Sequence, residues 1–133
     1  MRRVVAGAVL VLGLTGCGLW GSATPAEQRA GGSILLAAPS DPGDVMDAQI
    51  LGTLTRTDEG CLALASEWGD VYVLQFPFGS ELSDDGESVV VPGLGTLREG
   101  DRIDGGGGYI DVPDAPEECR ISEEFAVWQT VTG

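Results

Sequence analysis

Short runs of apolar and polar residues that alternate fill most of the chain after residue 45, and this pattern is typical of β-strands. Residues 50–55 alternate in this way, and a turn signal at 58–60 leads into a second run at 61–65. The two runs predict a hairpin. Residues 71–76 are β-branched and aromatic, which predicts a central strand that stops at Pro77 because proline cannot donate to a strand ladder.

Further short strands are predicted at 88–91, 109–112 and 125–131, with glycines at the bends between them. The four glycines at 105–108 predict a bulge or a sharp corner. Only residues 115–124 have a composition that could hold one short helical turn. Strands of this length and spacing predict an all-β domain over residues 45–133, a small closed or partly open OB-like barrel, since closure leaves no unpaired edge.

The first residues have a different pattern. Arg2 and Arg3 precede an uncharged apolar run at 4–14. A run of about 11 residues is too short to cross a bilayer, which needs roughly 20. Residues 1–16 are therefore predicted to be a secretory signal peptide that is removed.

The run ends in Leu14-Thr15-Gly16-Cys17, which resembles the lipobox of bacterial lipoproteins: an aliphatic residue, a small residue, glycine or alanine, and then cysteine. The resemblance implies that the Cys17 thiol is alkylated by diacylglycerol, that the chain is cut before it, and that the new amine receives a fatty acid such as palmitate. Several acyl chains would hold the protein to the membrane, on the extracytoplasmic face of the cell membrane. The alternatives are an ordinary secretory signal with a chance cysteine, or a cytoplasmic protein with an apolar start.

Residues 17–44 carry three prolines, the pair Gly31-Gly32 and scattered serine and alanine. This mixture disfavours helices and strand ladders, so we predict a flexible tether behind the lipidated cysteine. The apolar residues 34–36 interrupt the pattern and would form a minor strand on the domain or a helical turn within the tether.

Composition limits the chemistry. The chain has 133 residues, with 21 acidic residues against 7 arginines, neither lysine nor histidine, and a net charge of −14. Nucleic acids and anionic headgroups bind basic patches, so they are not expected as partners. The lack of histidine excludes Ser-His-Asp and Cys-His mechanisms and histidine-based metal sites.

If Cys17 carries lipid, Cys61 and Cys119 remain, and two cysteines in an exported domain predict a disulfide. The alternative is a redox-active pair. Acidic residues at 58–59 and 117–118 raise the pKa of neighbouring thiols, which favours the structural interpretation.

No catalytic residue, cofactor or metal site is predicted. The acidic residues at 84–87 lack the order of an EF-hand loop and are interpreted as a solvated loop. Three aromatic residues are candidates for a binding surface: Trp68, in a turn and expected to be exposed, and Phe76 and Phe78, which would line a groove next to it.

The folded part also resembles small secreted or lipid-anchored domains of actinobacteria. The matching positions are Gly60-Cys61-Leu62, Phe76-Pro77, Gly100-Asp101, Gly105-Gly106 and Cys119. This resemblance implies an OB-type barrel and says almost nothing about activity.

Taken together, these features predict a lipid-anchored, extracytoplasmic β-barrel that acts as a non-catalytic binding or cell-envelope accessory module. Its partners would be the membrane, through the N-terminal lipid, and an envelope protein or small ligand. The alternatives are a hydrolase that uses acidic residues or a metal, and a structural spacer.

Overall fold

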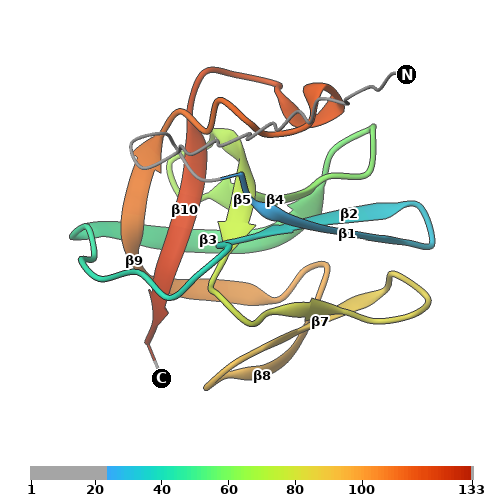
Figure 1. Cartoon of the computed structure of the whole chain (residues 1–133), viewed down its shortest axis with the longest axis horizontal. Coiled ribbons are helices and arrows are strands. Elements are labelled where there is room, and N and C mark those ends of the chain that lie inside the picture. Colours follow the sequence, from blue (N-terminus) through green and yellow to red (C-terminus); the bar gives the residue numbers. More distant parts are fainter. Residues whose placement is uncertain (1–23, 133) are drawn as a thin grey trace, which may run out of the picture.

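The computed structural model describes residues 24–132, which form ten strands and one short 3-10 helix (Figure 1). The elements are β1 (Ala26–Ala30), β2 (Ser33–Ala37), β3 (Ala48–Arg56), β4 (Leu62–Ser66), β5 (Val71–Phe76), β6 (Glu81–Leu82), β7 (Ser88–Val91), β8 (Gly95–Arg98), β9 (Arg102–Ile110), η1 (Glu117–Cys119) and β10 (Phe125–Val131). Several predicted strands, such as those at 71–76, 88–91 and 125–131, have the predicted bounds.

Five of the strands close into a barrel in the order β5-β10-β9-β3-β4, with β4 pairing back to β5. The β5–β10 pairing is parallel, and the other four pairings are antiparallel. The prediction of an all-β, OB-like barrel is therefore confirmed. Closure satisfies the backbone groups of these strands without leaving an edge between them.

Strand β9 bends sharply between its pairing with β3 and its pairing with β10, and the four glycines lie at this bend, in agreement with the predicted corner (Figure 1). They lie in the middle of the strand, where β9 pairs with both β3 and β10. The irregularity is on the opposite strand, where the register of β10 shifts between Trp128 and Thr130. A Cβ atom at Gly107 would overlap the carbonyl oxygen of Val127, so glycine is required here to let the two backbones approach.

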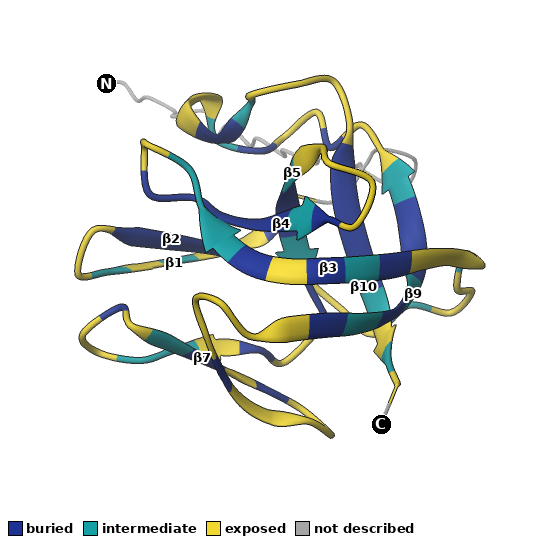
Figure 2. Ribbon diagram, turned by 180° about the vertical axis from the view of Figure 1, so that it is seen from behind, coloured by how far each residue is buried: buried dark blue, intermediate teal, exposed yellow. Residues whose placement is uncertain are grey.

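Residues 26–37 form an N-terminal hairpin, which corrects the prediction of a flexible tether over 17–44 for this part of the segment. Gly31 and Gly32 have φ angles of 55° and 83° and connect the strands as a two-residue turn. Positive φ at both positions is what a tight hairpin turn requires. All of β2 is buried, whereas β1 is more exposed (Figure 2).

Strand β2 joins the barrel because its apolar residues are buried on both faces. It pairs in parallel with the last residues of β5, Leu36 opposite Gln75 and Ala37 opposite Phe76. The described domain thus begins before the predicted boundary at residue 45. The outer strand β1 is linked to β6 by one side chain: Gln28 donates from Nε2 to the Ser80 carbonyl (3.1 Å) and accepts from the Leu82 amide (2.7 Å).

The apolar residues form two clusters on opposite sides of the barrel wall. The inner core fills the barrel and continues under the small sheet β6-β7-β8. Its largest buried side chains are Trp128 and Phe76. The outer core lies on the outside of β5 and β10, around Val73, Phe125 and Val127.

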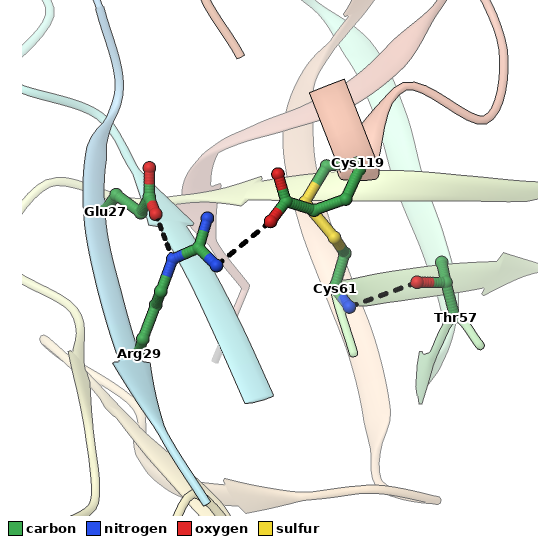
Figure 3. Close-up of a disulfide and its surroundings, with 6 residues drawn as sticks. Glu27, Arg29, Thr57, Cys61 and Cys119 are labelled. Atoms are coloured by element: carbon green, nitrogen blue, oxygen red, sulfur yellow. Dashed lines mark hydrogen bonds and ion pairs between the residues drawn. A yellow bond between two sulfur atoms is a disulfide. The ribbon is translucent and has the colours of Figure 1, made fainter. Parts of the chain in front are cut away.

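The outer core is covered by the cap segment, residues 111–124, which contains η1. Val112, Ala115 and Cys119 of this segment pack on it. Cys119 forms a disulfide with Cys61, with the Cα atoms 5.7 Å apart, as predicted (Figure 3). A stable disulfide indicates an extracytoplasmic location, because reducing compartments disfavour it.

An ion-pair cluster lies beside the disulfide (Figure 3). Arg29 of β1 contacts Glu27 on its own strand and Glu118 of the cap segment, the latter at 3.0 Å. The Cys61 amide donates to Thr57 Oγ1 at 3.0 Å. The N-terminal hairpin, β4 and the cap segment therefore meet at one point.

Candidate functional site

The three aromatic residues predicted to form a binding surface lie in different environments. Phe76 is completely buried, and its ring centroid is 5.8 Å from that of Trp128. Its side chain is part of the inner core, which corrects its assignment to a surface. Trp68 and Phe78 are 64% and 46% exposed.

Trp68 and Phe78 do not share a surface. Trp68 is in the turn before β5 and Phe78 follows the end of β5, so the length of a six-residue strand, about 20 Å, separates them. The Trp68 turn is held by Ser66 Oγ, which accepts from the amides of Trp68 and Asp70 at 3.3 Å each. The predicted groove next to Trp68 is therefore not formed.

Phe78 instead lines a different depression, at the point where the end of β5 meets β10 and the β2–β3 loop. This middle hollow has a volume of about 190 Å³. It is lined by Ala38, Pro39, Ser40, Pro42, Gln75, Pro77, Phe78, Val127, Trp128 and Gln129.

Two further hollows adjoin the middle one, one on each side. One, of about 200 Å³, shares Ala38, Pro39 and Phe78 with it and reaches β1 and Glu81. The other, of about 300 Å³, shares Pro39, Gln75, Val127 and Gln129 with it and reaches Met46, Ile110 and Pro113. Pro39 lines all three hollows, and we call the whole depression the Pro39 groove.

Local sequence fixes the two loops that form the groove walls. After Pro77 ends β5, Ser80 turns the chain by donating both its amide (3.1 Å) and its hydroxyl (2.8 Å) to the Pro77 carbonyl. Gly79 adopts a φ of 91° in this turn, which leaves the Phe78 ring on the outside. Such a φ angle strongly favours glycine.

The opposite wall is the β2–β3 loop, and it is tied down at both ends. The Ala38 amide donates to the Phe76 carbonyl at 2.9 Å. The Met46 amide donates to Gln129 Oε1 at 2.7 Å. These contacts hold Pro39 and Pro42 against the ends of β5 and β10, so the groove is preformed.

The charge around the groove is acidic. Glu81 and Asp111 line its two outer hollows. The β2–β3 loop adds the exposed residues Asp41, Asp44 and Asp47. Within residues 24–132, no arginine lines any of the three hollows.

The acidic residues 84–87 have a structural role in their own turn. The Asp85 carboxylate accepts from Ser83 Oγ at 2.7 Å and from the Glu87 amide at 3.0 Å. The hydrogen bond from Ser83 is the main reason that the pKa of Asp85 is lowered from its ordinary value. Among residues 24–132, no three or more acidic or cysteine side chains are grouped as a metal site would require.

The predicted signal peptide at 1–16 and the lipidated Cys17 lie outside the described residues. In the part of the chain that is described, no helix has the length and apolar character needed to cross a membrane.

Comparisons with protein-family models, with curated proteins and with solved structures find no match to this chain. Of the two resemblances, the structure bears out the small barrel.

Sequence reasoning found Phe78 but missed the residues around it, such as Pro39, Gln75 and Gln129. Pro39 lay within the predicted tether. Each of the two glutamines is half-buried and adjoins a buried aromatic residue of its strand, a pattern that could have marked a polar position within an apolar wall. The convergence of the two loops depends on the parallel β2–β5 pairing, which has no local signal.

Proposed function

We propose that this protein is a non-catalytic binding module of the extracytoplasmic space, held to the membrane by lipid on Cys17, and that the Pro39 groove receives its partner. The disulfide supports the compartment. The lipobox sequence Leu14–Cys17 supports the anchor. The groove supports binding because hydrogen bonds hold the two loops that form its walls against the barrel.

The observation that carries the proposal is the exposure of Phe78. Burying a phenylalanine side chain is worth about 1.5–3 kcal/mol, and this ring is left 46% exposed in an apolar wall. Exposed apolar surface next to a concave site and rimmed by polar residues is characteristic of interaction sites. The inner core, which already holds Phe76, has no need of this second ring for its own packing.

The residues in the groove favour binding over hydrolysis. The polar residues that line its middle hollow are Ser40, Gln75 and Gln129, and none of them is an acid or a base at neutral pH. The carboxylates of Glu81 and Asp111 line different hollows and share only Pro39 as a common lining residue. A pair of carboxylates that flanks one scissile bond would have to line the same hollow.

The binding proposal is tested by placing a photocrosslinking residue at position 78 of the full chain in intact cells. Val90 of β7 is similarly exposed and does not line the groove, so the same residue at position 90 is the matched control. We expect a discrete adduct at position 78 that is absent at 90 and is lost when Gln75→Arg fills the groove. Equal labelling at both positions, or none at 78, would contradict the proposal and favour a structural spacer.

The anchor is tested separately by mass and partitioning. Wild-type protein is expected to begin at Cys17 with attached acyl chains and to enter the detergent phase. Cys17→Ser should accumulate as an unprocessed precursor that no longer enters that phase. Unchanged partitioning of the Cys17→Ser protein would exclude the lipid anchor while leaving the groove untouched.

A further inference from the structure

We infer that the partner enters the Pro39 groove as an extended, cationic peptide segment, in which arginine or lysine residues stand beside apolar ones. This inference rests on the proposed binding function and adds the chemistry of the occupant. It follows from the shape, the lining and the charge of the groove.

The shape favours an extended chain. The two outer hollows share only Pro39 with each other, whereas each shares three or more residues with the middle one, so the three lie in a row. Each hollow has a volume of about 190–300 Å³, at or below the lower limit for a compact small-molecule site. An extended chain directs every second side chain to one face, about 7 Å apart, and can use several small hollows at once.

The lining suits a peptide as well. Pro39, Pro42, Pro77 and the Phe78 ring form rigid apolar walls, as in sites that recognise extended or proline-containing segments. Gln75 lines the middle hollow and one outer hollow. A glutamine amide has both donors and acceptors, which match the N–H and C=O groups of a passing backbone.

The acidic charge around the groove favours a positively charged partner. Asp41, Asp44, Asp47 and Glu81 are exposed around the groove. None of these four is among the acidic residues that lie within 4 Å of an arginine in residues 24–132. A ligand with positive charges next to its apolar side chains would find complementary potential here.

The same charge argues against a second copy of this chain as the occupant. Residues 24–132 contain all 21 acidic residues and only five arginines. Four of these arginines are already in ion pairs, namely Arg29, Arg56, Arg102 and Arg120. Two copies would repel each other, whereas a cationic segment of another protein would be steered toward the groove.

The inference is tested with the full chain in detergent and two fluorescent synthetic peptides. Both have the same core of leucine, proline and phenylalanine; one is flanked at each end by two arginines and the other by two glutamates. By fluorescence anisotropy at about 20 mM salt, we expect the arginine peptide to bind at least roughly tenfold more tightly. The difference should shrink at about 200 mM salt, because exposed charges are then screened.

Two variants and their matched controls locate the site. Phe78→Ala should weaken binding of the arginine peptide roughly tenfold, whereas Val90→Ala should leave it unchanged. The double variant Asp41→Asn with Glu81→Gln should weaken the arginine peptide and reduce its advantage over the glutamate peptide. Asp58→Asn with Glu59→Gln removes the same charge from the turn before β4 and should have little effect.

The outcomes separate this inference from the function that it rests on. Equal affinity for the two peptides, or equal losses in the groove variants and their controls, would overturn the cationic peptide. Full competition by arginine amide alone would also overturn it, since the occupant would then be a small cation. If the position-78 adduct still forms in cells in any of these cases, the binding function stands without this partner.

Discussion

The inner and outer cores both consist of buried residues, but different contacts keep each of them covered. The inner core is enclosed by strands that pair continuously around the barrel and, beyond them, by the small sheet β6-β7-β8. The outer core is roofed by the cap segment, residues 111–124, which contains no strand. Its polar and covalent attachments to the rest of the domain include the Cys61–Cys119 disulfide, the Arg29–Glu118 ion pair and a long hydrogen bond from Thr24 Oγ1 to Asp114 at 3.4 Å.

This difference shows which part of the fold depends on the covalent bond. A barrel ladder is cooperative, because each strand is paired on both sides, and it does not need a crosslink to stay closed. The cap segment has few attachments of its own, so its order depends on the disulfide. The inner core should therefore set the global stability, and the disulfide should set the local stability of the outer core.

The largest effect is expected from Phe76→Ala, which opens a cavity in the inner core. Truncation of a completely buried phenylalanine typically costs about 3–5 kcal/mol. Phe78→Ala, two residues away but exposed, should change stability by less than about 0.5 kcal/mol. Urea unfolding of both variants measures the contrast, and similar losses in the two would mean that Phe78 also packs in the core.

Removal of the disulfide is expected to have the next largest effect. The double variant Cys61→Ala with Cys119→Ala should lose about 2–4 kcal/mol, because the bond closes a long loop of the unfolded chain, with a sequence separation of 58 residues. Hydrogen exchange in β3 and β9 should accelerate only as far as this global loss requires, whereas the cap segment should open locally and accelerate further. Equal acceleration in the cap segment and in these strands would contradict the division into two cores.

The two cores can be compared at adjacent residues of β5, since Val73 belongs to the outer core and Leu74 to the inner one. Leu74→Ala should cost about 2–5 kcal/mol and Val73→Ala about 2 kcal/mol in the oxidised protein. In the background without the disulfide, the cost of Val73→Ala should fall by half or more, while that of Leu74→Ala is unchanged. The absence of this coupling would show that the cap segment stays in place without the bond.

The smallest effect is expected from Glu118→Gln, which breaks the ion pair to Arg29. The hydrogen bond from Arg29 lowers the pKa of Glu118, so the ionised form is favoured in the folded protein. Its stabilisation is present above the ordinary glutamate pKa of about 4.3 and is lost as the pH falls through the lower folded-state value.

We therefore expect Glu118→Gln to lower Tm by at most a few degrees at pH 7, because the pair is exposed. The difference from wild type should disappear at about pH 2, where both proteins are neutral at this position. Glu123→Gln, in the same cap segment, is the control for a general charge effect. A difference that persists at about pH 2 would show that the glutamine disturbs packing and not an ion pair.

Local patterns predicted most of the barrel but little of the groove. The alternation in β3 and the apolar run of β5 are properties of consecutive residues, and their bounds agree closely with the structure. The Gly31-Gly32 pair between short strands was also a local hairpin signal, but neighbouring prolines gave the segment the composition of a linker. Phe76 and Phe78 are identical residues on either side of Pro77, so their types do not indicate which one is buried. The turn at Ser80 decides this, because it directs the chain away from the core after Pro77.

The outer core and the Pro39 groove depend on contacts between distant segments. Strand β2 pairs with β5 although β3 and β4 lie between them in the sequence. The cap segment contacts the start of β4 through a disulfide that spans 58 residues. The cysteines could be paired because only two remained after Cys17. The convergence of the β2–β3 loop with the turn after β5 had no comparable marker.

The single glutamine that links β1 to β6 has a consequence for solubility. Strand β6 is an outer strand of the three-stranded sheet, and a bare outer strand offers a template on which other chains can pair. The carboxamide of Gln28 occupies the Ser80 carbonyl and the Leu82 amide as a paired backbone would. One neutral side chain thereby covers part of the β6 edge, which protects it against pairing with another chain without a charge and without a further strand.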